Sequence, residues 1–136
     1  MQIGIFPTTF NRSTLDETLD AMVAQGLYAA QVDLGVTGLP DLPEVIDPAD
    51  VVRIHQAFAS RAITINAVAG HFNMVHPNGA EREAGLRSLR AIAGACAGLG
   101  TGLITLCTGT RNPTSMWRPH PDNGTPAAWR ALVATL

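Results

Sequence analysis

Apolar residues along the chain alternate between short continuous runs and runs at helical spacing, a pattern typical of strands that are followed by helices. Four times an apolar run precedes a segment in which apolar residues recur every three or four positions. The runs predict strands at 3–6, 31–34, 64–68 and 103–107. Four strand-helix units in succession imply a parallel sheet whose crossover connections are right-handed.

Residues with a high capping propensity stand at the start of each helical segment. They are Thr14 with Glu17 in a capping box, Asp47 before a proline, Asn78 with Glu81, and Thr125 before a proline. The helical spacing groups Leu15, Leu19, Met22 and Val23 in the first helix, Val51, Ile54, His55 and Phe58 in the second, Leu86, Leu89, Ile92, Ala93, Cys96 and Leu99 in the third, and Trp129, Leu132, Val133 and Leu136 in the fourth. The third group is predicted to be a buried stripe, and His55 to serve packing or the surface.

A parallel sheet of this kind is either an open doubly wound sheet or part of a barrel. No GxGxxG motif follows the first strand, and residues 6–10, FPTTF, lack the glycines of a phosphate-binding loop. Gln31 and Asp33 fall on one face of their strand, which suits the polar inner mouth of a barrel. The sequence therefore predicts an α/β fold, a (β/α)8 TIM-type barrel of which this chain supplies about the first four β-α units.

Residues 1–136 are predicted to form a single partial domain, the amino-terminal half of such a barrel. Four strands alone would leave two open sheet edges and an uncovered inner face, and the last helix has no carboxy-terminal cap. Barrels of this type usually have about 250 residues. We therefore expect the carboxy-terminal half to lie outside this sequence and the fragment to be inactive alone. The alternative is a complete small α/β domain.

Composition and charge limit the classes of binding partner that we expect. The formal net charge is −2 and charges form no long runs of one sign, so neither nucleic acid nor a membrane surface is expected as a partner. No export signal is visible at the start of the chain, which favours a cytoplasmic protein. Cys96 and Cys107 form no CxxC pair and predict neither a disulfide nor a zinc site. A small-molecule partner fits best, and a homo-oligomer stays open.

In β/α barrels the loops after the strands build the active site. Imidazole and amide groups can bond to sugar hydroxyls, arginine can clamp an anion, and tryptophan can form a flat apolar wall. The candidates are Asp33 after the second strand, His71, Asn73 and His76 in loop 70–78, and Arg111, Trp117, Arg118 and His120 in loop 107–125. Because the strands are parallel, we expect the last two loops to lie together at one end of the sheet.

Most of these candidates also have a purely structural interpretation, which the sequence leaves open. A histidine can bond to a backbone carbonyl or be satisfied at the barrel mouth, and a carboxylate can be held by hydrogen bonds. An arginine can pin a loop through ion pairs, and a tryptophan can pack beneath it. The backbone contact applies to His76, the barrel-mouth position to His71, and the hydrogen-bonded carboxylate to Asp33. Arg111 and Arg118 are the arginines that can form ion pairs, and Trp117 is the tryptophan that can pack beneath the loop.

The segments IGIFPTTF, QVDLG, GHFNMVHP and TLCTGTRNPTSMWRPHPDN, in this order, resemble the sugar phosphate isomerase/epimerase family of xylose-isomerase-like barrels. The likeness covers the whole chain and is most specific in the last two segments. It implies an isomerase or epimerase that acts on a sugar, sugar phosphate or related polyol ketone by proton transfer through an enediolate. It also implies a divalent metal ion, Mn, Mg, Co or Zn, whose Glu, Asp, His and Glu ligands belong to the second half of the barrel.

Within this resemblance the first half holds the substrate, and the catalytic residues are expected in the second half. His71, Asn73 and His76 would bond to sugar hydroxyls, Trp117 would wall the site, and Arg111 or Arg118 would engage any phosphate. His71 is in addition a weak metal candidate. Two other functions stay open: an apurinic endonuclease-like metal-dependent barrel, and a barrel that has lost catalysis and serves as a binding module.

Overall fold

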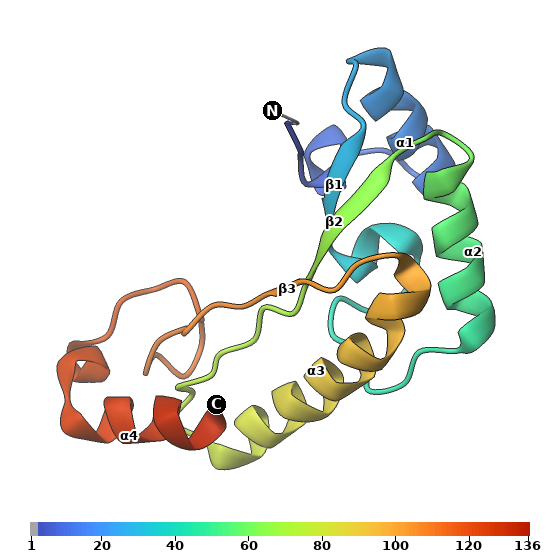
Figure 1. The fold of residues 1–136 in the computed structure, drawn as a ribbon. Coiled ribbons are helices and arrows are strands. Elements are labelled where there is room, and N and C mark those ends of the chain that lie inside the picture. The colour runs from blue at the N-terminus through green and yellow to red at the C-terminus, as the bar shows by residue number, and fades with distance from the viewer. Residues whose placement is uncertain (1–2) are drawn as a thin grey trace.

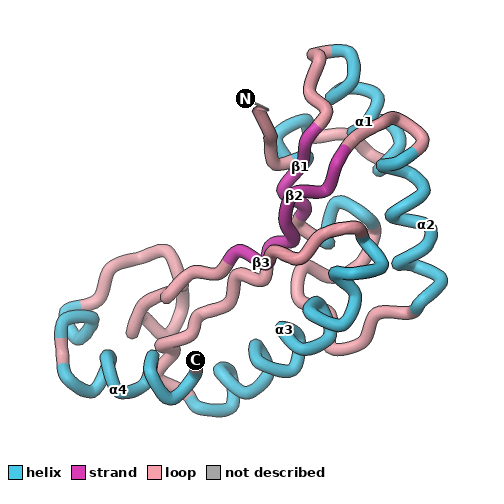
Figure 2. The backbone as a smooth tube through the Cα atoms, in the orientation of Figure 1, coloured by secondary structure: helices cyan, strands magenta, loops and turns pink. Residues whose placement is uncertain are grey.

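The structure is a computed structural model, and it describes residues 3–136. It is an α/β fold in which helices alternate with short parallel strands (Figures 1 and 2). The elements are η1 (Pro7–Phe10), α1 (Leu15–Ala24), β1 (Ala29–Val32), η2 (Leu34–Thr37), α2 (Pro48–Ala59), β2 (Thr64–Ala69), α3 (Gly79–Leu99), β3 (Ile104–Thr105), η3 (Pro121–Gly124) and α4 (Pro126–Thr135), where η marks a 3₁₀ helix. Among these helices, none is both long enough and apolar enough to cross a membrane.

The sheet is parallel, and its strands lie side by side in the order in which they occur along the chain. β2 pairs with β1 on one side and with β3 on the other. Ile5 forms a parallel bridge with Ala30, so the first apolar run lies beside β1. Within residues 3–136 the strand order never reverses, whereas a doubly wound sheet reverses at its switch point. Figure 1 shows α1, α2 and α3 on the same side of the sheet.

Three predicted strands have other boundaries in the structure. β1 begins at Ala29, two residues before the predicted start, and ends at Val32 because Leu34 opens η2. The first run forms only the bridge at Ile5, and the run 103–107 contributes only Ile104–Thr105. Both runs lie at an edge of the described sheet, where a strand has hydrogen-bond partners on one side alone. The strand predicted at 64–68, at the centre of the sheet, is confirmed, and it extends to Ala69.

The predicted helix starts are confirmed by their caps. Thr14 Oγ1 accepts a hydrogen bond from Glu17 N (3.2 Å), and the Glu17 carboxylate accepts one from Thr14 N (3.2 Å), which completes the capping box. Asp47 caps α2, Asn78 caps α3 and Thr125 caps α4, each through a side-chain oxygen that accepts from a backbone N–H of the first turn. These local signals fix where each helix begins.

The hydrophobic core lies between the sheet and the three helices that cover it. Its buried members include Leu19, Met22, Val32, Ile54, Phe58, Ile65, Val68, Ile92, Cys96 and Leu99. The predicted stripe of α3 is wrong at Ala93, which is exposed, while Ala95 is buried. On α4, Trp129, Val133 and Leu136 are exposed, at 67%, 57% and 80%, so most of the predicted apolar face of this helix lies at the surface.

Two glycines of α3 offer a matched test of this packing. A Cβ at Gly85 would overlap the ring of buried Phe72, whereas a Cβ at Gly94 would meet nothing. Alanine in a helix is favoured over glycine by about 1 kcal/mol, and overpacking costs about 1–3 kcal/mol. We expect Gly94→Ala to raise the free energy of unfolding by about 1 kcal/mol and Gly85→Ala to lower it, measured by urea denaturation. Equal stabilisation by both variants would contradict the described contact between α3 and Phe72.

Candidate functional site

The carboxyl ends of the three strands bring four polar residues together. Gln31 Nε2 donates a hydrogen bond to Thr105 Oγ1 (2.6 Å), and Thr105 Oγ1 lies 3.1 Å from His71 Nε2. Asp33, which follows β1, interacts electrostatically with His71. We refer to Gln31, Asp33, His71 and Thr105 as the inner cluster. Its members come from the ends of β1, β2 and β3, where ligands bind in parallel sheets.

The inner cluster lies on the face of the sheet that is turned away from α3. A Cβ at Gly70 would contact Ile104 and Leu89, so Gly70 faces the helix. Because side chains alternate along a strand, the neighbours His71 and Thr105 point to the opposite face. Figure 1 shows none of α1, α2 or α3 over that face. All four members of the cluster are partly exposed to solvent.

Asp33 is half-buried, and within residues 3–136 its carboxylate accepts no hydrogen bond. Burial raises the pKa of Asp33 above its usual value; the nearby His71 acts to lower this pKa, and Asp41 acts to raise it. The structural interpretation, in which hydrogen bonds hold this carboxylate in place, does not describe what is observed. A partly desolvated carboxylate without donors, beside an imidazole, is typical of a site that handles a ligand or a proton.

Two aromatic side chains flank the imidazole of His71. The ring centroids of Phe6 and His71 are 6.4 Å apart, and those of His71 and Trp117 are also 6.4 Å apart, the latter in an edge-on arrangement. Trp117 is 71% exposed, so it does not pack beneath its loop. Rings in these positions leave a flat apolar surface next to the polar cluster.

Asn73 is engaged in holding the two loops together. Its Nδ2 donates to the carbonyl of Thr110 (2.8 Å), and its Oδ1 accepts from Thr110 N (2.9 Å). Gly109 has a φ of +75°, and a Cβ there would overlap the Asn73 side chain. The amide of Asn73 therefore pairs with the backbone of loop 107–125 much as a neighbouring strand would.

Several other predicted residues also join the loops. His76 Nε2 lies 3.2 Å from the carbonyl of Pro113, and its Nδ1 accepts from Asn78 N (3.1 Å). Arg111 donates to the carbonyl of Val75 (3.0 Å), and no ion pair involving it is present within residues 3–136. These contacts confirm that the third and fourth loops lie together at one end of the sheet.

The remaining two candidates, Arg118 and His120, form no hydrogen bond with the inner cluster within residues 3–136. His120 caps η3 by accepting from Asp122 N (3.2 Å). Arg118 is exposed and has no ion pair within the described part of the chain. The structure thus brings together Asp33, His71 and Trp117 of the predicted residues, while Asn73, His76 and Arg111 connect loops.

Sequence reasoning missed three contributors. Thr105 lies within an apolar run, and Phe6 lies in the first run, so neither was selected as a site residue. Asn123 accepts from Thr110 Oγ1 (2.9 Å) and from Arg111 N (2.7 Å), which fixes the base of loop 107–125. The only signal in the sequence was the polar hydroxyl of Thr105 among apolar neighbours.

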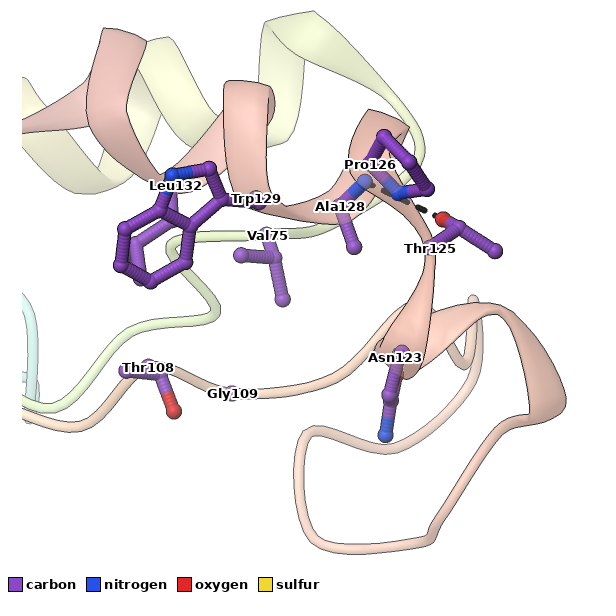
Figure 3. A pocket seen from close by; sticks show the side chains of 10 residues that line it. Val75, Thr108, Gly109, Asn123, Thr125, Pro126, Ala128, Trp129 and Leu132 are labelled. Carbon is purple, nitrogen blue, oxygen red and sulfur yellow. Dashed lines mark hydrogen bonds between the residues drawn. The ribbon is translucent and has the colours of Figure 1, made fainter.

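A large cavity lies elsewhere, between α4 and the two loops (Figure 3). It measures about 710 Å³ and is bounded by Val75 and by Trp129, Leu132 and Ala128 of α4 on one side, and by Thr108, Gly109 and Asn123 on the other. None of the eight predicted site residues lines it. Its walls are mainly apolar, so this cavity and the inner cluster are separate features.

No group of three or more His, Cys, Asp or Glu side chains within residues 3–136 is arranged to hold a metal ion. His71 has Asp33 as its acidic neighbour, and this pair alone is not a metal site. Cys96 and Cys107 are free thiols, and burial raises the pKa of each. In comparisons with known proteins, no family model, no curated protein and no solved structure matches this chain.

The raised pKa of Asp33 predicts a pH-dependent effect on stability. The folded state favours the protonated carboxyl of Asp33. The free energy of unfolding is therefore not reduced by this group at low pH, and it falls as the pH rises through the folded pKa of Asp33. We expect Asp33→Asn to raise the melting temperature at pH 7 and to have little effect below about pH 3, where the carboxyl is protonated in both states.

Glu44 provides a control of opposite sign. Its hydrogen bond with the Arg87 guanidinium lowers the pKa of the Glu44 carboxyl, so the stability it contributes is present at neutral pH and lost as the pH falls. Glu44→Gln should lower the melting temperature slightly at pH 7 and not at low pH. If Asp33→Asn lowered it at pH 7 in the same way, Asp33 would be a structural carboxylate.

Proposed function

We propose that this chain forms part of a (β/α)8 barrel that isomerises or epimerises a sugar, a sugar phosphate or a related polyol ketone. The observation that carries the proposal is the inner cluster beside Phe6 and Trp117, at the carboxyl ends of parallel strands. Polar groups that converge next to a flat apolar wall suit a ligand with hydroxyls on its edge and C–H bonds on its face.

The order of the strands supports the barrel part of the proposal. The first apolar run, β1, β2 and β3 follow one another across the sheet as they do along the chain, with α1 to α3 on one side. A closed barrel has this arrangement, and its active site lies at the carboxyl ends of its strands. The opposite face of the sheet, which carries the inner cluster, would then point into the barrel.

The chemistry expected of the chain's own residues is substrate handling. Moving a proton between adjacent carbons of a hydroxy-ketone requires that the two oxygens be oriented and that a base approach the carbon. His71 and Asp33 offer a nitrogen and a carboxylate to such oxygens, and Trp117 supports the carbon chain. A carboxyl with a raised pKa is also better suited to exchange protons near neutral pH than an ordinary one.

The metal dependence implied by the family resemblance has no counterpart among residues 3–136. The inner cluster contains one carboxylate and one imidazole, which do not make a complete ligand set. We therefore assign no step to a metal ion. If the proposal is right, metal bound by the protein is held by other residues, and its content does not depend on Asp33 or Trp117.

The test is turnover of a panel of free and phosphorylated ketoses by the full-length protein, with and without Mn²⁺, Mg²⁺, Co²⁺ or Zn²⁺. His71→Gln and Asp33→Asn should lower kcat/KM by roughly 10²-fold or more, because each removes a group that contacts substrate. Trp117→Ala should raise KM. His55→Gln, on the exposed face of α2, is the matched control and should leave turnover unchanged.

Other outcomes would identify the alternative functions. Incision of abasic DNA without activity on any ketose would favour the endonuclease-like barrel. Saturable binding of a sugar without turnover under any metal condition would favour a binding module. Normal turnover in both His71→Gln and Asp33→Asn would remove the inner cluster from the site.

A further inference from the structure

The hydrogen bonds of the inner cluster span three strands. Gln31 belongs to β1 and Thr105 belongs to β3, so the Gln31 side chain must cross β2 to reach the hydroxyl. The β2 residues that pair with them are Ala67 and Ala69, whose methyl side chains leave room for this crossing. The hydroxyl of Thr105 then meets the imidazole of His71.

The direction of these hydrogen bonds follows from the groups involved. Gln31 Nε2 can only donate, so Thr105 Oγ1 accepts from it. The hydroxyl proton of Thr105 is then free to point at another acceptor, and among the described residues the ring nitrogen within hydrogen-bond distance is His71 Nε2. A nitrogen that accepts from a hydroxyl carries no proton in the neutral ring.

We infer that Thr105, oriented by Gln31, is a positioning residue that holds the neutral His71 as its Nδ1–H tautomer. Within residues 3–136, His71 Nδ1 has no hydrogen-bond partner. Asp33 interacts electrostatically with the ring, and Phe6 and Trp117 flank it. The Nδ1–H group is thus available as a donor on the open side of the sheet.

The use of that donor rests on the proposed function. A neutral N–H aimed at a ketose can donate to a carbonyl or hydroxyl oxygen without adding a full positive charge to the site. Fixing the tautomer in advance removes the need to move a proton before substrate binds. The tautomer itself does not depend on any activity, so it can be tested separately.

The other described histidines with hydrogen-bonded rings supply an internal reference. His76 Nδ1 accepts from Asn78 N and His120 Nδ1 accepts from Asp122 N, so the proton of each neutral ring lies on Nε2. His76 Nε2 in turn lies 3.2 Å from a carbonyl, to which it donates. His71 should therefore be the exception among these three.

The experiment is ¹⁵N NMR of the imidazole nitrogens in uniformly labelled protein, at a pH above the titration of the rings. The signals of His71 are assigned from the spectrum of His71→Gln. Wild-type His71 should show a protonated Nδ1 and an unprotonated Nε2, with the opposite pattern for His76 and His120. A wild-type His71 protonated at Nε2 would overturn the inference without bearing on the proposed function.

Two variants test the cause. Thr105→Val removes the hydroxyl at nearly constant shape and should shift His71 toward the Nε2–H tautomer, while Thr105→Ser should keep the wild-type pattern. In Gln31→Glu the carboxylate accepts the Thr105 proton, so Thr105 Oγ1 can accept from His71 Nε2 and the tautomer should reverse. An unchanged Nδ1–H signal in both Thr105→Val and Gln31→Glu would contradict the role of these residues.

The kinetic result separates this inference from the proposed function. If both are right, Thr105→Val lowers kcat on the ketose that the protein converts, and Thr105→Ser restores it. A tautomer that shifts as expected in a protein with no activity on any ketose would support the positioning role and reject the proposed function.

Discussion

The parallel pairing of β2 with both of its neighbours is the interaction on which the rest of the structure depends. β2 is the one described strand with hydrogen-bonded strands on each side, and it joins β1, β3 and the helices into one unit. Its register also determines the site. Between the partners of Ala30 and Gln31, β2 contains one additional residue, Asn66, and this bulge sets which of the following side chains face the helices.

The two faces of β2 serve different purposes because their side chains differ in size. Ile65 and Val68 are large and lie in the core formed with α1, α2 and α3. Ala67 and Ala69 are small and allow polar side chains of neighbouring strands to meet above them. The hydrophobic core and the polar inner cluster thus lie on opposite sides of the same strand, as expected where helices cover one face of a parallel sheet.

The sequence predicted the helices better than the strands, for a physical reason. A cap such as Thr14 with Glu17 is a contact within one turn, so the residues that make it are visible in the sequence. The length of a strand depends on a partner far along the chain, and runs at an edge of the sheet shortened to one bridge or two residues. The order of elements and the shared end of the loops were therefore predictable, whereas strand boundaries were not.

The distinction between local contacts and contacts with distant residues also applies to the candidate site. It explains which side chains have no backbone partner and so remain available to a ligand. Residue type singled out two loops that do lie together, but it cannot tell a group that binds substrate from one that binds backbone. Asn73 pairs with Thr110, and His76 with Pro113, 37 residues away in each case. These contacts tie loop 70–78 to loop 107–125.

The contacts between the two loops determine how the loop residues should be tested. Because the amide of Asn73 and both ring nitrogens of His76 are already engaged with backbone groups, truncating either residue leaves backbone N–H or C=O groups without a partner. The loop would loosen, and Trp117 would lose its fixed position against His71. Such variants would therefore test the geometry of the loops, whereas Asp33, whose carboxylate has no hydrogen-bond donor within residues 3–136, can be changed without breaking such a contact.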